Sequence, residues 1–197
     1  MWSDWFKLVN GFVLCGISGI MPCCYDQRDP MHFRLANNLA AKVKVKPEPC
    51  LPLADDPLID FSSNLFRFDR SQYILVSHTT TLFSAIIPAR GLTSGHVLAI
   101  SSLTAISEVL EHVGLLELYQ SKLSPGSRVV RFGKALNRSV TGSMNELIVR
   151  ATHKMSPETP LFEVGIFINK LLLSMLKNDD GRQYGRPTEA MRRLLQA

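Results

Sequence analysis

The sequence holds few cysteines and none of the spacings that bind zinc. Four cysteines occur among 197 residues, and three of them fall within the first 24 residues. There is no CxxC pair and no regular spacing, which argues against both a zinc site and a disulfide framework. A chain without disulfides fits a reducing compartment, so we expect the protein in the cytoplasm.

Motifs of the common enzyme classes are also missing. There is no GxSxG nucleophile elbow and no Ser-His-Asp order with a supporting turn. Gly133 and Lys134 precede Ser139 without the glycine-rich lead-in and the Lys-Ser/Thr pair of a phosphate loop. Glu108 and His112 lie one helical turn apart and could share a metal, but no third ligand is identifiable, so we favour a surface contact. The sequence predicts no metal and no cofactor, and it leaves open whether the protein is an enzyme.

No apolar run is long enough for an unambiguous membrane span. Residues 8–24 are mostly apolar, but this run contains glycines and Pro22 and is shorter than the ~20 residues that a span requires. A secretory signal would need a positively charged start, which residues 1–7 lack. Signal, anchor and upstream extension remain open. We favour an N-terminal extension over residues 1–30, outside a single domain of residues 31–197, and a membrane partner only if residues 8–24 serve as an anchor.

Positive charge is concentrated in one part of the chain. Apolar residues make up 46% of the sequence, as in a globular protein, and the net charge is +5. The window 126–154 has a single acid, Glu146, against six bases, so it alone carries a charge equal to that of the whole chain. These bases are Arg128, Arg131, Lys134, Arg138, Arg150 and Lys154. Such a window attracts nucleic acid or an acidic protein, unless acids lie close to it in the fold.

Hydrophobic periodicity predicts an α+β domain. An apolar and aromatic pattern with short polar joints predicts a three-stranded antiparallel meander within residues 64–87. Further strands are expected at 31–35 and 128–132, and helices at 36–45, 98–113, 143–155, 161–176 and 187–195, with a proline-rich loop at 46–57. We therefore expect an antiparallel sheet of four or five strands packed against three or more helices.

The segment 137–146, with the sequence NRSVTGSMNE, is the strongest candidate for a binding site. We interpret it as a loop between a basic strand and a helix that begins at Ser143, where Ser143 and Glu146 form a capping box. A helix N-terminus binds anions, and Arg138 could clamp a phosphate or a carboxylate. The predicted ligand-binding residues are Asn137, Arg138, Ser139, Asn145, Arg131 and Lys134. The alternative is structural, with the polar side chains capping the helix, Gly142 supplying a positive φ and Arg138 tied to an acid.

Four stretches together resemble a family of uncharacterised bacterial proteins that share a domain of unknown function. They are residues 31–45, 64–75, 85–88 and 137–146, and the similarity spans about residues 31–154. The last stretch resembles an NRSVxGSMND motif, with Glu146 in place of the aspartate. The resemblance implies that the domain begins at Met31, and it implies no reaction.

Two hypotheses on function follow. The first is a non-enzymatic binding or regulatory module that meets nucleic acid or an acidic protein through four basic residues, Arg128, Arg131, Lys134 and Arg138. The alternative is an enzyme that holds a small phosphorylated or nucleotide substrate in the loop 137–143, with Asp60, Asp69 or His78 as candidates for the general base.

Overall fold

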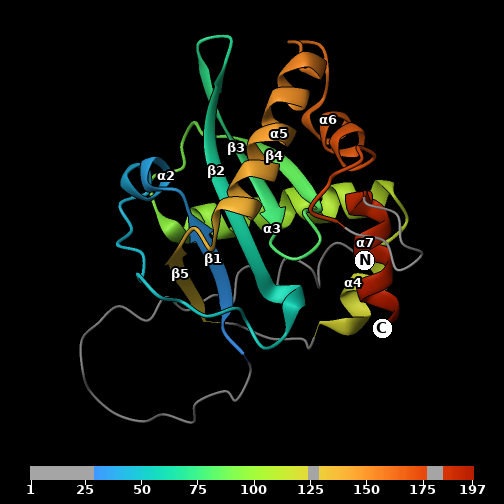
Figure 1. Cartoon of the computed structure of the whole chain (residues 1–197). Helices are drawn as coiled ribbons and strands as arrows, with labels where there is room; N and C mark the ends of the chain where they lie inside the picture. The colour runs from blue at the N-terminus through green and yellow to red at the C-terminus, as the bar shows by residue number, and fades with distance from the viewer. Residues whose placement is uncertain (1–28, 124–128, 177–183) are drawn as a thin grey trace.

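A mixed five-stranded sheet is the framework of the protein (Figure 1). The computed structural model describes residues 29–123, 129–176 and 184–197. Its strands are β1 (Met31–Leu35), β2 (Asp60–Phe68), β3 (Ser71–His78), β4 (Ser84–Pro88) and β5 (Val130–Lys134). Its helices are α2 (Asn37–Lys42), the short 3₁₀ helix η1 (Pro57–Ile59), α3 (Gly95–His112), α4 (Leu116–Lys122), α5 (Arg138–Lys154), α6 (Leu161–Ile168) and α7 (Pro187–Gln196).

The sheet has the order β4-β3-β2-β1-β5. The predicted meander is confirmed, because β2, β3 and β4 pair antiparallel through short turns. The expectation of an antiparallel sheet throughout is wrong, since β1 runs parallel to both of its neighbours, β2 and β5. Parallel neighbours need long crossover connections, and the chain provides them through α2 and the following loop and through α3 and α4.

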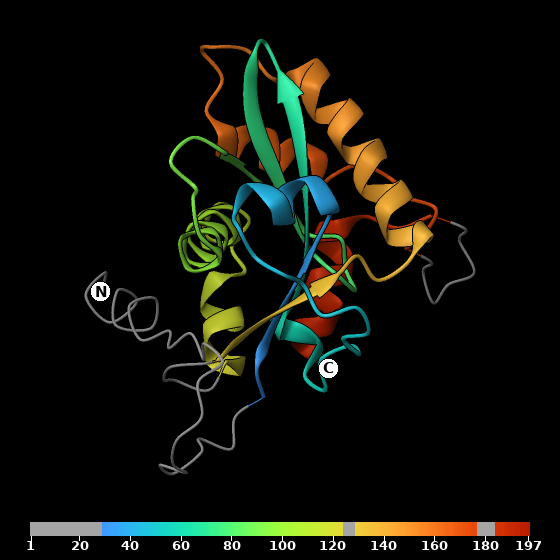
Figure 2. The same cartoon turned by 90° about the vertical axis from the view of Figure 1, so that its left-hand side faces the viewer.

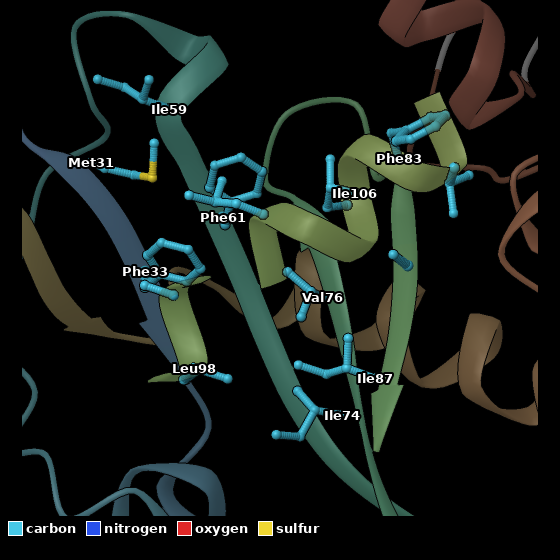
Figure 3. Close-up of a cluster of buried hydrophobic side chains, with 14 of the residues drawn as sticks. Met31, Phe33, Ile59, Phe61, Ile74, Val76, Phe83, Ile87, Leu98 and Ile106 are labelled. Carbon is cyan, nitrogen blue, oxygen red and sulfur yellow. The ribbon is translucent and has the colours of Figure 1, made fainter. Parts of the chain in front are cut away.

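The two faces of the sheet are covered by different helices. Along β3 and β4, Val76 and Ile87 belong to one hydrophobic cluster, with α3, whereas Leu75 and Ile86 belong to a second cluster, with α5 and α6. Neighbouring residues of a strand point to opposite faces, so the alternation places α3 and α5 on opposite sides (Figure 2). The first cluster is centred on Phe33 and Phe61, whose rings stack at a centroid distance of 5.3 Å (Figure 3).

Several helix boundaries differ from those predicted. Helix α2 ends at Lys42, because Lys44 adopts a positive φ of 56°. Helix α3 begins three residues earlier than expected, because the Ser94 side chain accepts a hydrogen bond from the Val97 amide. Helix α4 was not predicted at all. Helix α7 begins with Pro187 in its first turn, as expected.

Helix α6 stops at Ile168, eight residues before its predicted end. The next residue, Asn169, is fully buried and bonds the edge strand β4 instead of the solvent. Its side-chain oxygen accepts from the Ser84 amide and its side-chain nitrogen donates to the Ser84 carbonyl, both at 2.8 Å. This amide pairs with the strand edge as another strand would, so the periodicity that predicted a longer helix was misleading.

Candidate functional site

The candidate motif lies at the start of a long helix, and it is not a loop. Strand β5 ends at Lys134, and α5 begins only four residues later, at Arg138. The side chain of Asn137 accepts a hydrogen bond from the Val140 amide at 2.9 Å and so caps the helix. The prediction of a strand-to-helix loop over residues 137–143 is therefore wrong, because Asn137 takes the capping role that had been assigned to Ser143.

Ser143 and Gly142 have no special backbone role. Both lie inside α5, and Gly142 is not among the glycines with a positive φ. The predicted capping box of Ser143 and Glu146 is wrong for the same reason, since the backbone amides around Ser143 are already inside the helix. A Cβ atom at Gly142 would meet nothing within 4 Å, so this glycine borders open space.

The predicted binding residues differ in whether their side chains already have partners within the protein. Asn145 accepts a hydrogen bond from Asn64 Nδ2 at 3.0 Å and thereby ties α5 to β2. Arg131 forms an ion pair with Glu48, in which both side chains stay about two-fifths exposed. Arg138 and Ser139 are exposed, and their side chains have no partner among the described residues.

We call Arg131, Lys134 and Arg138 the basic edge. Lys134 is exposed at the end of the edge strand β5, and its side chain also lacks a partner in the described part of the chain. The expectation that nearby acids would balance this charge holds for Arg131, through Glu48, but no such acid contacts Lys134 or Arg138 within the described ranges. Arg128 lies outside the described residues.

A buried ion pair, which the sequence did not predict, lies on the sheet next to the basic edge. Arg34 on β1 and Asp60 on β2 are at most 1% exposed, and the guanidinium donates from Nε to Asp60 Oδ1 at 2.8 Å and from Nη2 to Oδ2 at 2.6 Å. Two further bonds run from Arg34 to the carbonyls of Leu51 and Pro52. These residues belong to the loop between α2 and η1, residues 46–56, which is thus held on the sheet.

Asp60 has no free lone pair positioned for acid–base chemistry. Besides Arg34, its carboxylate accepts from Thr79 Oγ1 at 2.7 Å and from the Ala54 amide at 3.1 Å. A buried carboxylate that accepts four hydrogen bonds holds the segments of its donors together. Asp60 is thus a poor general base, and Asp69 lies at the exposed tip of the β2–β3 hairpin.

Two buried histidines lie near Asp60, one on each face of the sheet. Nδ1 of His32 lies 3.7 Å from Asp60 Oδ2, and neither ring nitrogen of His32 has a hydrogen-bond partner. Burial lowers the pKa of His32, with Asp60 acting in the opposite direction and Arg131 and Arg34 adding to the decrease.

His78 is fully enclosed on the opposite face of the sheet. Its Nδ1 lies 2.9 Å from Thr81 Oγ1, and burial lowers its pKa to about 4. The ring is therefore neutral near pH 7, and it has no route to a substrate at the basic edge. His78 is thus not placed to act as the general base that the enzyme hypothesis requires.

Other candidates from the sequence have local partners. His112 Nδ1 lies 2.8 Å from the Glu108 carbonyl, and the His112 ring stacks on Phe162 with a centroid distance of 4.3 Å. Within the described residues, no group of three His, Cys, Asp or Glu side chains could hold a metal ion. In the same part of the chain, no helix has the length and apolar character needed to cross a membrane.

A family model described as a domain of unknown function (DUF6933) matches residues 32–190. The chain belongs to this family. The match includes β1 from its second residue, the other four strands, α2 to α6, the basic edge and the Arg34–Asp60 pair, so these are features of the DUF6933 domain in this chain. Comparisons with curated proteins and with solved structures gave no match.

Proposed function

We propose that this DUF6933 protein is a non-enzymatic binding module that holds nucleic acid against its basic edge. The observation that carries the proposal is the pair of exposed cations, Lys134 and Arg138, which have no partner among the described residues. Cations that form no internal ion pair have no such pair to break when they contact phosphate, and each contact releases counterions from the nucleic acid.

The start of α5 adds to this positive potential. No acidic residue occupies the first turn of α5, so its partial positive charge is not compensated there. The Asn137 side chain satisfies the Val140 amide, and the earlier amides of the first turn have no intrahelical acceptor. Lys134 and Arg138 flank this turn, so charge and backbone donors lie together.

Arg131 contributes in a different way. Its ion pair with Glu48 is about two-fifths exposed, and exposed ion pairs contribute only about 0–1 kcal/mol. A phosphate group can therefore replace Glu48 as the partner at small cost. We place Arg131 at the rim of the contact, with Lys134 and Arg138 at its centre.

The geometry supports a binding module more than an enzyme. An acid–base reaction needs a titratable group within hydrogen-bond reach of the substrate. Asp60 is fully engaged, His78 is enclosed, and Asp69 lies at the far end of the hairpin from β5. The small-substrate alternative therefore has an anion-binding helix start, but none of the three base candidates from the sequence lies at it.

The test is filter binding of nucleic acid at about 50 and 200 mM salt, because phosphate contacts make binding salt-dependent. The edge variant Lys134→Glu/Arg138→Glu should bind at least about tenfold more weakly than wild type. The control Lys170→Glu/Arg192→Glu changes the same number of exposed cations elsewhere. An edge variant that binds like this control would rule out the proposed site, and salt-independent binding would rule out a phosphate contact.

A further inference from the structure

A second group of cations surrounds the outer half of the β2–β3 hairpin. Its members come from α2 and its C-terminal turn, from the hairpin, and from the turn after β4. They are Lys42, Lys44, Arg67, Arg70 and Arg90, which we call the hairpin surface. The hairpin rises beyond the other strands, with α2 beside it, between the hairpin and β5 (Figures 1 and 2).

Contacts to Gln72 bring the three segments together. Lys42 Nζ donates to Gln72 Oε1 at 2.9 Å, and Arg67 is the strand partner of Gln72 across the hairpin. The amide of Ala89 donates to the Gln72 carbonyl at 2.9 Å, which places Arg90 one residue from the same point. Lys42, Arg67 and Arg90 therefore come from segments that meet at Gln72, although 48 positions separate Lys42 from Arg90 in sequence. Lys44 follows Lys42 by two residues, and Arg70 precedes Gln72 by two residues.

Little in the structure balances this charge. All of these cations except the half-buried Lys42 are exposed, and none forms an ion pair with a described residue. Asp69 is the only acidic residue in the segments 36–46, 64–72 and 84–91 that carry them. Like charges held close together repel one another, which argues that their grouping serves a ligand.

The hairpin turn is strained in a way that supports a functional role. Asp69 and Arg70 form a two-residue turn with φ values of 43° and 61°. Glycine is strongly favoured at such positions, because a side chain makes this conformation unfavourable. An arginine at the tip therefore costs stability, and strained residues of this kind cluster at functional sites.

We propose that the hairpin surface is a second phosphate-contacting surface, and that the ligand is a nucleic acid duplex. The inference rests on the proposed function and names its ligand class. Proteins that bind single strands stack bases on exposed aromatic rings. Here the aromatic side chains of the hairpin contact one another. Phe66 stacks on Tyr73 at a centroid distance of 5.8 Å, Phe68 meets Tyr73 edge-on at 6.5 Å, and all three pack in the cluster under α5.

The geometry fits phosphate contacts on both sides of α2. The basic edge lies at the end of β5, the hairpin surface extends from the C-terminal end of α2 to the tip of the hairpin, and α2 itself carries no acidic residue. A duplex presents phosphates along two strands, so a rigid ligand can meet both surfaces at once. A flexible single strand gains no such advantage from two separated groups of cations.

The experiment measures fluorescence anisotropy with a labelled duplex and with one of its strands, at about 50 and 200 mM salt. Four proteins are compared: wild type, the edge variant, the hairpin variant Arg67→Glu/Arg70→Glu, and the control Lys170→Glu/Arg192→Glu. We expect wild type to bind the duplex more tightly than the strand. The hairpin variant should weaken duplex binding by about tenfold or more and reduce the salt slope by about 2, the value for two lost contacts.

A fifth variant, Arg70→Gly, separates binding from folding. It should melt at or above the wild-type temperature, since it removes the strain, and it should still bind the duplex more weakly. If Arg70→Gly binds as tightly as wild type, Arg70 makes no contact with the duplex and does not belong to the hairpin surface.

The outcomes separate the two proposals. A hairpin variant that binds like the control, beside a weakened edge variant, would overturn this inference and leave the proposed function standing. A weakened hairpin variant beside an edge variant that binds like the control would reject the basic edge and keep the hairpin surface. Tighter binding of the single strand would reject the duplex, and no binding by wild type at low salt would reject both proposals.

Discussion

Arg34 donates hydrogen bonds to Asp60 and to two carbonyl groups of the loop of residues 46–56, and so one side chain holds this loop on the sheet. The pair is 26 positions apart in sequence, so no local pattern reveals it. The alternation in Met31–Leu35 does place Arg34 on the face opposite Phe33. The loop of residues 46–56 covers that face at Arg34.

Removing one partner of the buried pair should destabilise the protein strongly. Arg34→Met leaves the Asp60 carboxylate buried without its main donor, which costs about 3–5 kcal/mol. Glu48→Gln breaks the exposed pair with Arg131 and should cost less than about 1 kcal/mol. Urea denaturation of both variants measures the two free energies. Equal losses for the two variants would show that the Arg34–Asp60 pair does not hold the loop.

The capping residue of α5 can be identified by two alanine substitutions. Asn137→Ala removes the acceptor of the Val140 amide and should lower the free energy of unfolding by about 0.5–2 kcal/mol. Ser143→Ala, inside the helix, should leave it unchanged or raise it slightly, because alanine is the better helix former. Thermal melting of both variants provides the comparison. A lower melting temperature for Ser143→Ala than for Asn137→Ala would restore the capping box at Ser143.

At the scale of helices and strands, two glycines inside helices differ in the space around them, Gly165 being closely packed and Gly142 open. Gly165 of α6 faces α3, and a Cβ atom there would lie 2.8 Å from Val109 Cγ2. Gly165→Ala should therefore destabilise the protein by about 1–3 kcal/mol through overpacking. Gly142→Ala in α5 meets open space and should stabilise by about 0.5–1 kcal/mol.

Urea denaturation of the two glycine variants is a matched test, because both positions lie inside helices. Opposite signs are expected for the two changes in unfolding free energy. A neutral Gly165→Ala would mean that α3 and α6 can separate slightly, and that their close approach is not a constraint on the fold.

The elements that could be predicted are those with local signals. The strands within residues 64–87 alternate clearly and are joined by short polar turns, so their antiparallel pairing followed from the sequence. The start of α5 did not, because Asn137 and Ser143 are both good capping residues six positions apart. The hydrogen bond from the Val140 amide to the Asn137 side chain in the folded structure decides between them.

At the scale of the whole molecule, the partners of β1 could not be predicted. Its sequence shows a strand, but the choice of β2 and β5 as parallel neighbours depends on crossover connections whose direction no local pattern sets. The cations of the proposed binding surfaces also differ in whether the sequence reveals them. The cations of the basic edge were visible as a charge window, whereas the hairpin surface is assembled from distant segments and emerges only in three dimensions.

The two buried histidines predict that the protein loses stability in mild acid. The folded state lowers the pKa of His78 from 6.5 to about 4 and also lowers that of His32, so the unfolded chain binds more protons in this window. Stability therefore falls as the pH drops from about 6.5 towards 4, by about 3 kcal/mol for His78 alone.

Urea denaturation at pH 7 and at pH 4.5 measures this loss. His78→Asn keeps an acceptor for Thr81 but cannot take up a proton, so its stability should change less with pH than that of wild type. Comparing the two proteins cancels the contribution of the carboxylates to the change in stability, because both proteins contain them. One of these carboxylates is Glu48, whose pKa is lowered by its hydrogen bond to Arg131. An identical pH dependence for wild type and His78→Asn would contradict the buried neutral histidine.

Hydrogen exchange with and without a duplex tests most directly whether nucleic acid binds at the basic edge. The amides of residues 130–141, at the end of β5 and the first turn of α5, should exchange more slowly when the duplex is bound, whereas those of α7 should be unchanged. This contrast within one protein needs no substitution and so no correction for altered folding. Slower exchange in α7 with no change across residues 130–141 would contradict the account.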